Sequence, residues 1–243
     1  MHNAAYAALS IDAIYLAFDV RAAELGDAVA GMRGLGIRQL SVSLPHKEAI
    51  LAHLDEVDET ARRIGAVNTV LRRDGALVGS NTDWLGAVGA LERETRLEGK
   101  QAVVLGAGGT ARAVVYGLCA RGARVQVLNR TAEKARALAD DLGADGAGGL
   151  EELRDRPYDV LVNTTSVGLG EDVSPIDAEH LGEGGVVLDA VYEPERTRLL
   201  RDAEARGARV VSGKWMLVYQ AVAQLEAWTG RTAPVEVMAK AFA

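Results

Sequence analysis

A glycine-rich turn at residues 106–111 has residue types and spacing that point directly to chemistry. The apolar run Gln101-Ala-Val-Val-Leu105 predicts a strand, and Gly106, Gly108 and Ala111 follow it. Gly106 permits a tight turn, Gly108 lets the backbone approach a pyrophosphate, and the small Ala111 lets a helix pack closely on the strand. Phosphates at such a turn meet the free N–H groups at the helix N-terminus. The segment therefore predicts a dinucleotide site.

The residues after the next strand indicate which dinucleotide binds. An NAD site carries Asp or Glu there, which binds the ribose 2′-hydroxyl. This chain instead has Asn129-Arg130-Thr131 after the run 124–128. A guanidinium can grip a 2′-phosphate through two parallel hydrogen bonds, so we predict NADP(H). Glycine turns also join strands to helices without a ligand, and Arg130 alone would be a solvated surface residue. The two strands and the arginine together favour the dinucleotide.

A lysine and an aspartate elsewhere could handle the proton of a hydroxyl that is being oxidised. Lys47 follows a predicted strand in Ser41-Val-Ser-Leu-Pro-His-Lys47, Asp83 begins a predicted helix, and Asn68 lies on a strand. A lysine can stabilise an alkoxide and exchange its proton, and a carboxylate beside it can hold it in place. Spacing alone favours an exposed lysine and an N-cap aspartate, because nothing in the sequence shows that the two residues meet.

The composition limits the class of protein. The 243 residues suffice for one large domain or two modest ones, and 49% of them are hydrophobic. A net charge of −7 argues against nucleic acid as a partner. The single cysteine, Cys119, excludes an internal disulfide and fits a reducing cytoplasm. The histidines lack metal-ligand spacing, so we expect no metal, and no stretch is long and apolar enough for a membrane span.

The first third of the chain predicts short strands and helices in alternation. Strands are expected at residues 13–18 and 39–43, helices at 22–33 and about 47–64, and a hairpin at 67–79 around Asp74-Gly75. A further helix of about three turns is expected to follow Asn81-Thr-Asp83 and to end near Gly99.

The middle of the chain predicts an α/β series. Near-continuous apolar strands between helices indicate a parallel sheet covered on both faces. Strands are expected at 101–105, 124–128, 158–162, 186–190 and 208–211, and helices at 109–121, 132–142 and 195–206. Residues 143–153 are ambiguous and could hide a short strand. The stretch Trp215–Ala243 predicts two helices divided by Gly230 and Pro234.

These elements predict an α/β protein of two domains with a cleft between them. Residues 1–83 and 214–243 would form a substrate-binding and catalytic domain, to which the C-terminal helices return. Residues 84–213 would form a Rossmann-like, parallel-sheet NADP domain. A cleft between domains is a common site for a small molecule.

Motifs along nearly the whole chain resemble those of the shikimate dehydrogenase family, in the same order. They are Ser-Val-Ser-Leu-Pro-His-Lys47, Gly65-Ala-Val-Asn-Thr69, Asn81-Thr-Asp-Trp-Leu-Gly86, Gly106-Ala-Gly-Gly109, Asn129-Arg-Thr131, Asn163-Thr-Thr-Ser-Val-Gly168, Asp189-Ala-Val-Tyr-Glu-Pro194 and Met216-Leu-Val-Tyr-Gln-Ala221. The resemblance implies reversible reduction of 3-dehydroshikimate to shikimate with NADPH, in the biosynthesis of aromatic amino acids.

The resemblance also implies residue roles on the substrate side. Lys47 and Asp83 become the catalytic pair that contacts the hydroxyl being oxidised. The family motifs make substrate ligands of Ser43, Asn68 and Gln220, and place Tyr192 near the substrate. Many buried hydrogen bonds suit a polyhydroxy acid, because each unmet partner penalises a wrong substrate. Other roles stay open: Asn68 could satisfy the backbone, Gln220 could lie on a helix face, and Tyr192 could serve packing.

On the cofactor side, the resemblance assigns three groups of residues. The glycine turn comprises Gly106, Ala107, Gly108, Gly109, Thr110 and Ala111. The 2′-phosphate would be bound by Asn129, Arg130 and Thr131, with Lys134 as a weaker candidate. The remaining cofactor contacts would be Thr164, Val167 and Gly168 along the cofactor, with Gly213 and Met216 near the nicotinamide.

Two departures from the family pattern concern the substrate side. The family opens with a strand and a Gly-x-Pro…Ser-x-Ser-Pro segment before the match to His2-Asn3, whereas this sequence begins at Met1. That segment holds two serines for the substrate carboxylate and an edge of the N-terminal sheet. We expect a misassigned start or a truncation, and, for the sequence as it stands, weak carboxylate binding and lower stability at that edge. Ser43 stands where the family more often has threonine, which could relax selectivity toward quinate.

Three alternatives to the main interpretation stay open. The chain could act on quinate or an aminated shikimate, or it could be a catalytically impaired NADP-binding protein. A different two-domain dehydrogenase with a lysine acid/base is disfavoured by the Asn-Thr-Asp83 and Gly-Ala-Val-Asn-Thr69 motifs. The sequence leaves the oligomeric state open, with a homodimer as one alternative.

Overall fold

The computed structural model describes residues 1–242, apart from the side chain of Asp155, and the chain divides into two compact units. Unit 1 comprises Met1–Asp83 and Gln220–Ala243, and unit 2 comprises Trp84–Tyr219. Helix α8 (Gly213–Thr229) is continuous across this division, which falls at Gln220. The division therefore lies inside α8, six residues after the expected boundary between residues 213 and 214.

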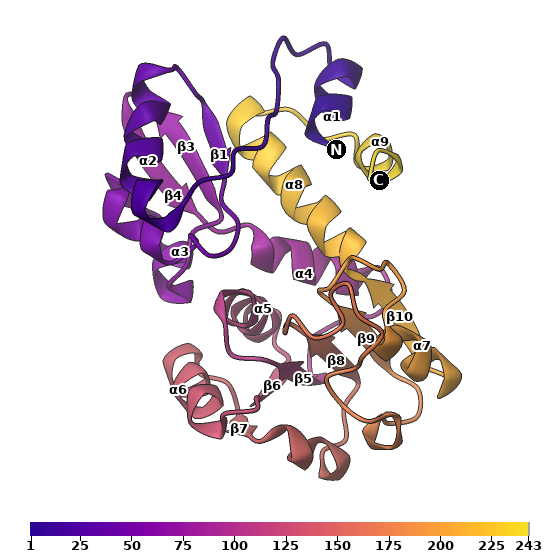
Figure 1. Cartoon of the computed structure of the whole chain (residues 1–243). Coiled ribbons are helices and arrows are strands. Elements are labelled where there is room, and N and C mark those ends of the chain that lie inside the picture. The colour runs from indigo at the N-terminus through magenta and orange to yellow at the C-terminus, as the bar shows by residue number, and fades with distance from the viewer. Residues whose placement is uncertain (243) are drawn as a thin grey trace. The chain divides into compact units, whose positions relative to one another are not determined.

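Unit 1 is built on a four-stranded sheet in the order β1-β3-β4-β2. Its strands are β1 (Gln39–Ser41), β2 (Glu56–Val57), β3 (Thr69–Arg73) and β4 (Ala76–Ser80). Strands β1, β3 and β4 lie beside one another in Figure 1. Strands β1 and β3 are antiparallel, as are β3 and β4, whereas β2 runs parallel to β4. The predicted hairpin is confirmed, because Asp74 and Gly75 both have positive φ, as a tight turn between twisted strands requires.

Besides part of α8, the described residues of unit 1 form four α-helices, of which α2 (Leu25–Gly34) and α3 (Glu59–Ile64) pack on this sheet. The other two are α1 (His2–Ala8) and α9 (Val235–Lys240), and η1 (Ala22–Glu24) and η2 (Ala49–His53) are short 3₁₀ turns. Helix α2 buries Leu25, Val29 and Met32, which repeat at helical spacing and pack in one core with Val70 and Leu77 of the sheet. Helices α1 and α9 are in contact.

The expected strand at residues 13–18 is wrong. The segment has no strand partner among the described residues; the backbone N–H and C=O of Tyr15 instead bond to the side chain of Asn3. Its alternating apolar side chains Ile14, Leu16 and Phe18 are exposed. The alternating pattern marks a segment able to be half buried on a sheet, but a strand exists only where a neighbour supplies the hydrogen bonds.

The expected helix over residues 47–64 is also wrong as one element. It is divided into η2, β2 and α3, because the carboxylate of Asp55 accepts a hydrogen bond from the backbone N–H of Leu77 and so ties this segment to β4. Asp58 then caps α3 by accepting from the N–H of Ala61. The helix beginning at Asp83, α4 (Asp83–Glu92), ends well before Gly99.

Unit 2 contains the parallel sheet that the sequence predicts. Its strands are β5 (Gln101–Leu105), β6 (Arg124–Leu128), β7 (Gly146–Gly148), β8 (Val160–Asn163), β9 (Val186–Asp189) and β10 (Arg209–Ser212). Their order is β10-β9-β8-β5-β6-β7, and every adjacent pair is parallel. Strand β7 lies in the segment that the sequence left ambiguous.

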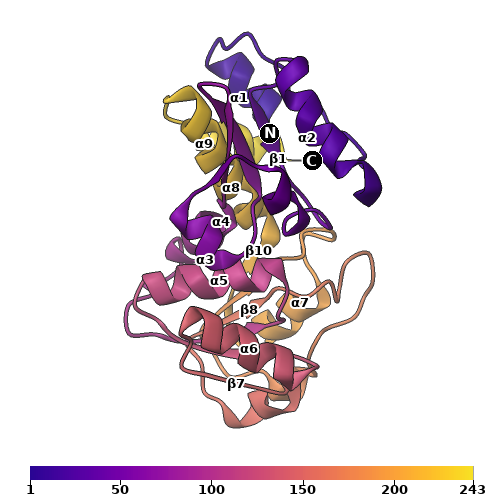
Figure 2. The same ribbon diagram turned by 90° about the vertical axis from the view of Figure 1, so that its left-hand side faces the viewer.

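Helices cover both faces of this sheet. On one face α4, α5 (Gly109–Ala120) and α6 (Ala132–Leu142) pack against Val104 and Val162. The other face is covered by α7 (Arg198–Ala205) and the 3₁₀ turns η3 (Leu150–Asp155) and η4 (Ala178–His180). Figure 2 shows α5 and α6, which contact each other, in front of the strands. The architecture is the doubly wound α/β fold expected from the sequence.

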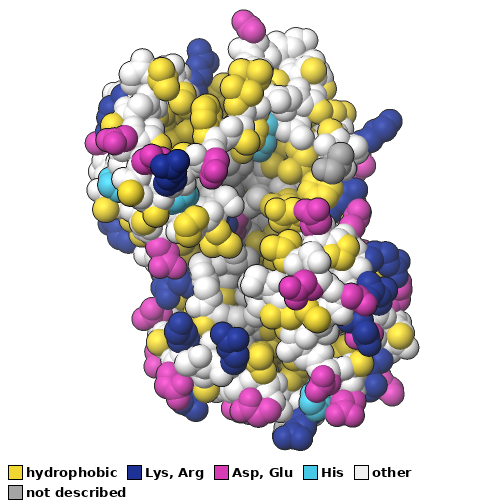
Figure 3. Space-filling view, viewed as in Figure 1, with side chains coloured by type: hydrophobic (Ala, Val, Ile, Leu, Met, Phe, Trp, Pro, Cys, Tyr) yellow, Lys and Arg dark blue, Asp and Glu magenta, His cyan; other side chains and the backbone are white. Residues whose placement is uncertain are grey.

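The visible surface of unit 2 mixes charges of both signs. In Figure 3, Lys and Arg side chains lie among Asp and Glu side chains over unit 2. Hydrophobic side chains gather over unit 1. Across residues 1–242, none of the helices combines the length and the apolar character needed to cross a bilayer.

Candidate active site

Lys47 and Asp83 form a largely buried ion pair in unit 1. The Nζ of Lys47 lies 2.6 Å from Oδ2 of Asp83, and the two side chains are 13% and 2% exposed. The loop that carries Lys47 is fixed because its carbonyl accepts from the N–H of Val67 just before β3. Asp83 is fixed at the start of α4, where its own N–H bonds to the side chain of Asn81 and the helix dipole favours a negative charge.

Asn68 connects this pair to the sheet. Its Nδ2 donates to Oδ1 of Asp83 at 2.8 Å and lies 3.3 Å from Oε1 of Gln220. Its Oδ1 accepts from the backbone N–H of Thr82 at 2.7 Å, and this contact fixes the orientation of the amide because a backbone N–H can only donate. The structure thus brings Lys47, Asn68, Asp83 and Gln220 together, although they come from four separate segments.

The polar network extends beyond the residues that the sequence identified. Thr69 donates from Oγ1 to Oδ1 of Asn68 at 2.8 Å, and Gln224 donates from Nε2 to Oγ1 of Thr69 at 3.0 Å. Ser41 closes the chain by donating to Oε1 of Gln224 at 2.9 Å. The only sequence signal for Gln224 is its place four residues after Gln220, which puts both on one face of α8.

Ser43, the remaining predicted substrate ligand in the N-terminal segment, lies outside this network. Its side chain is exposed, whereas Ser41, two residues earlier, is joined to it through Gln224. The arrangement around Lys47 combines a partly accessible cation, a buried carboxylate and a buried amide in one polar cluster. Such a cluster can hold a hydroxyl and move its proton, because the amine is partly accessible while its counter-ion is not.

In unit 2 the glycine turn connects β5 to α5. Gly106 has φ of +111°, and a Cβ there would lie 2.6 Å from Oγ1 of Thr164, so only glycine fits. A Cβ on the exposed Gly108 would meet no atom within 4 Å. Gly108 is the N-cap of α5, and no side chain caps the N–H groups of the first turn there. Ala111 is buried in the core under the turn.

This turn lies where the order of the sheet reverses. From β5 the chain proceeds outward to β6 and β7, then returns to β8 on the other side of β5 and continues to β9 and β10. Ligands of open α/β sheets bind beyond the carboxyl ends of the strands at such a switch point. The predicted cofactor residues that follow β5, β6 and β8 all lie at these carboxyl ends: Gly106, Ala107, Gly108, Gly109, Thr110, Asn129, Arg130, Thr131, Thr164 and Val167.

The residues expected to bind the 2′-phosphate are accessible. Arg130, Thr131 and Lys134 are exposed, and Asn129 is held by a hydrogen bond from its Nδ2 to the carbonyl of Thr131. Within the described part of the chain, the guanidinium of Arg130 makes no hydrogen bond or ion pair. A free guanidinium beside the glycine turn suits a phosphate group.

The other residues predicted to contact the ligands differ in accessibility. Val167 and Tyr192 are exposed, whereas Met216 is 6% exposed and packs in the core of unit 2. Gly213 is buried, and a Cβ there would lie 2.7 Å from the carbonyls of Ala190 and Val191. The hydroxyl of Thr164 donates to the carbonyl of Leu105 at 2.6 Å.

A second buried polar network lies at the end of β9. Asp189 accepts from Nδ2 of Asn163 at 2.8 Å, from the N–H of Val191 at 3.0 Å and from the hydroxyl of Thr197 at 2.6 Å. Burial raises the pKa of the Asp189 carboxyl above its ordinary value, and these hydrogen bonds oppose the rise. The network fixes the loop that leads to Tyr192.

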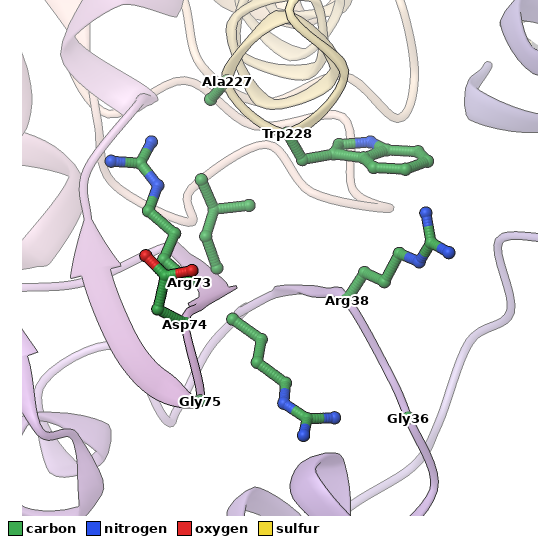
Figure 4. Close-up of a pocket in the computed structure, with 9 residues that line it drawn as sticks. Gly36, Arg38, Arg73, Asp74, Gly75, Ala227 and Trp228 are labelled. Atoms are coloured by element: carbon green, nitrogen blue, oxygen red, sulfur yellow. The ribbon is translucent and has the colours of Figure 1, made fainter.

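Unit 1 also has a surface cavity of about 410 Å³ beside β1, β3 and α8. Figure 4 shows Arg38, Arg73 and Trp228 around it, with Asp74 beside Arg73. None of its lining residues belongs to the network around Lys47 and Asp83.

Three family models match separate stretches of the sequence. Residues 1–70 match the shikimate dehydrogenase substrate binding domain, residues 89–168 match shikimate / quinate 5-dehydrogenase, and residues 213–241 match the shikimate 5′-dehydrogenase C-terminal domain.

Individual relatives match the chain over almost its full length. The chain is 48% identical to shikimate dehydrogenase (NADP(+)) of Thermococcus kodakarensis over 95% of its own length and 85% of that protein. It is 46% identical to shikimate dehydrogenase (NADP(+)) of Pyrococcus abyssi, over 98% of its own length and 89% of that protein.

Solved structures give the same result. One is shikimate 5-dehydrogenase of Thermus thermophilus in complex with NADP(H) and shikimate, with a TM-score of 0.93 and 41% sequence identity. The match covers 98% of this chain and 90% of the Thermus chain. The 5-ketofructose reductase of a Gluconobacter strain has a TM-score of 0.88 at 40% identity, with the same two coverages. The chain therefore belongs to the shikimate dehydrogenase family.

Proposed function

We propose that this chain is an NADP-dependent enzyme that reversibly reduces 3-dehydroshikimate to shikimate, a step in aromatic amino-acid biosynthesis. The observation that carries the proposal is the buried Lys47–Asp83 pair on the Asn68 amide, in a chain with this family's motifs. A polyhydroxy acid offers hydroxyl groups for such a cluster, and buried polar groups that stay unpaired penalise a substrate lacking them.

The Lys47–Asp83 pair handles the proton of the reacting hydroxyl. In the direction of shikimate oxidation, the C–H bond breaks and its hydride leaves the carbon, while the hydroxyl proton passes to the pair and a ketone forms. In the reverse direction the pair returns the proton to the carbonyl oxygen. The ammonium of Lys47 stabilises the alkoxide that develops between these states, and Asp83 keeps the ammonium in place. Asn68 and Gln220 bind the neighbouring hydroxyls.

The residues of unit 2 fit NADP(H). When bound, this cofactor supplies or accepts the hydride. The open space over Gly108 and the uncapped first turn of α5 suit a pyrophosphate. The exposed Arg130 suits the 2′-phosphate, with Asn129 and Thr131 beside it. Thr164, Val167 and Gly213 follow β8 and β10 at the same edge of the sheet.

The proposal is tested by measuring NADP⁺ reduction in the presence of shikimate, with NAD⁺ in a parallel reaction. We expect turnover with shikimate and NADP⁺, and a strong preference for NADP⁺ over NAD⁺. A chain that binds NADPH but turns over neither shikimate nor quinate would instead be a non-catalytic NADP-binding protein. A preference for NAD⁺ would refute the role of Arg130.

A second candidate function is reduction of a different polyhydroxy ketone. It is favoured by the match of residues 89–168 to shikimate / quinate 5-dehydrogenase and by the 40% identical 5-ketofructose reductase. The exposed Ser43 is the residue at which a change of selectivity toward quinate is expected. Assays with quinate and with 5-ketofructose, compared by kcat/KM with the assay using shikimate, separate these substrates.

A further inference from the structure

Gln224 lies inside the polar network of unit 1 without touching Lys47 or Asp83. This residue of α8 is only 3% exposed, and both the oxygen and the nitrogen of its amide make hydrogen bonds. Oε1 accepts from the hydroxyl of Ser41 at 2.9 Å, while Nε2 donates to Oγ1 of Thr69 at 3.0 Å and lies 3.4 Å from the carbonyl of Asn68. The Asn68 carbonyl can only accept, so Nε2 must be the end that faces β3.

This orientation fixes the direction of the next hydrogen bonds. Because Oγ1 of Thr69 accepts from Gln224, its own proton is directed to Oδ1 of Asn68, 2.8 Å away. Oδ1 of Asn68 is then held by Thr69 and by the N–H of Thr82, and its Nδ2 is aimed at Oδ1 of Asp83. A chain of donors therefore runs from Ser41 to the carboxylate that binds Lys47.

We propose that Gln224 is a positioning residue for the Lys47–Asp83 pair and acts on it through Thr69 and Asn68. The kinetic part of this inference rests on the proposed function. A different role is conceivable for any buried glutamine, namely joining β1 to α8 and contributing only to stability. The two roles predict different results when Gln224 is replaced. If Gln224 positions the pair, kcat and the hydrogen exchange of the Asn68 side-chain amide both change; if it contributes only to stability, neither changes.

The first test replaces Gln224 by methionine, which keeps the length of the side chain and removes its hydrogen bonds. We expect kcat for shikimate oxidation to fall about 10-fold, which corresponds to a loss of about 1.4 kcal/mol of transition-state stabilisation. The KM for NADP⁺ should change less than about 2-fold, because Gln224 is not among the residues proposed to bind the cofactor. Thr229→Ala is the matched control: it removes a hydrogen bond to Leu225 in the same helix but touches no residue of the network.

A double-variant cycle decides whether Gln224 acts through Thr69. Thr69→Val should lower kcat like Gln224→Met, Thr69→Ser should retain it, and the double variant Thr69→Val/Gln224→Met should be no slower than Thr69→Val alone. Additive losses, or an unchanged kcat in Gln224→Met, would overturn the proposal. If Gln224→Met does not fold, Ser41→Ala serves instead, since it keeps the packing of α8 and should give a smaller loss of the same kind.

A second measurement is independent of turnover. Hydrogen exchange of the Asn68 side-chain amide, followed by ¹⁵N NMR, should accelerate at least about 10-fold in Gln224→Met. Asn163 is the internal reference, because it makes the same 2.8 Å bond to an aspartate in unit 2 and should exchange at its wild-type rate. Unchanged exchange at Asn68, or equal acceleration at both amides, would contradict positioning. If the wild-type chain turns over no shikimate, the proposed function fails, whereas this measurement still decides the role of Gln224.

Discussion

Two buried aspartates, one in each unit, share an asparagine partner and differ in the group at their other oxygen. Asp83 and Asp189 are 2% and 0% exposed, and each accepts a 2.8 Å hydrogen bond at Oδ1 from an asparagine side chain. At the other oxygen, Asp83 meets the ammonium of Lys47, whereas Asp189 meets the hydroxyl of Thr197, both at 2.6 Å. One carboxylate therefore holds a cation and the other holds only neutral donors.

The difference separates a carboxylate suited to chemistry from one that organises a loop. Neutral donors leave the cost of burying a charge on Asp189 incompletely compensated, and burial raises its pKa. Asp83 has a counter-ion, and that counter-ion is 13% exposed, so a substrate hydroxyl can reach it. Buried hydrogen bonds alone thus do not indicate a catalytic role; a partly accessible cation on a buried carboxylate does.

Removing the cation should give the largest effect on activity. In Lys47→Ala we expect kcat to fall about 10²- to 10⁴-fold, the usual contribution of a positioned acid or base, with little change in the KM for NADPH. Steady-state kinetics in both directions measure this. Lys100→Ala is the matched control, since Lys100 also pairs with an aspartate, Asp159, at 3.0 Å, but that pair is exposed. An unchanged kcat in Lys47→Ala would exclude Lys47 from the reaction.

Much of the doubly wound sheet could be predicted from the sequence, because buried parallel strands leave continuous apolar runs such as 101–105. The prediction of a strand at residues 13–18 was wrong for a physical reason. Alternation of apolar and polar residues shows which side chains could be buried, but a strand forms only where a neighbouring strand pairs with it. The division of residues 47–64 depended on a bond from Leu77 to Asp55, which no local pattern reveals.

The candidate site was predictable only in part. Residue spacing was enough to predict the glycine turn and Arg130, because each is defined by a short stretch of sequence beside one strand. The meeting of Lys47 with Asp83 depends on where two distant segments fold, and only the family resemblance suggested it. Gln224 was missed because its partners lie on β1 and β3, far from it in the sequence.

Truncating Asp189 should affect stability and leave chemistry nearly intact. Asp189→Ala leaves three donors without an acceptor, so we expect the free energy of unfolding to fall by about 3 kcal/mol. Urea unfolding followed by circular dichroism measures the loss. Asp141→Ala, which removes an exposed partner of Arg112, should cost under about 1 kcal/mol. A loss of kcat as large as that in Lys47→Ala would remove the distinction between the two aspartates.

The exposed residues of unit 2 should show a third behaviour, in which affinity changes without stability. In Arg130→Ala we expect the KM for NADPH to rise about 10-fold, since charge-assisted hydrogen bonds are worth about 1.5–3 kcal/mol, while NADH use stays nearly constant. Arg136→Ala is the control, because Arg136 is equally a surface arginine but pairs with Glu133 along α6. Equal losses with NADPH and NADH would show that Arg130 does not bind the 2′-phosphate.

The smallest effect expected is a loss of stability with rising pH that comes from Asp189. Because its pKa in the folded state lies above the ordinary 3.8, the folded chain keeps a proton that the unfolded chain releases. The contribution of Asp189 to the free energy of unfolding is therefore fully present below pH 3.8. It is lost as the pH rises through the raised pKa. Asp189→Asn cannot titrate, so its destabilisation relative to wild type should shrink as the pH rises from about 4 and then stay constant to about 8.

Asp159 provides the opposite case as the control for this pH series. The N–H of Gln101 and the ammonium of Lys100 lower the pKa of its carboxyl, so its contribution is present above 3.8 and is lost only in stronger acid. The destabilisation in Asp159→Asn should accordingly stay constant over the range in which that of Asp189→Asn shrinks. Urea unfolding at each pH measures both differences. If the destabilisation in Asp189→Asn grew with pH, the Asp189 carboxyl would have a lowered pKa, and its neutral donors would outweigh the effect of burial.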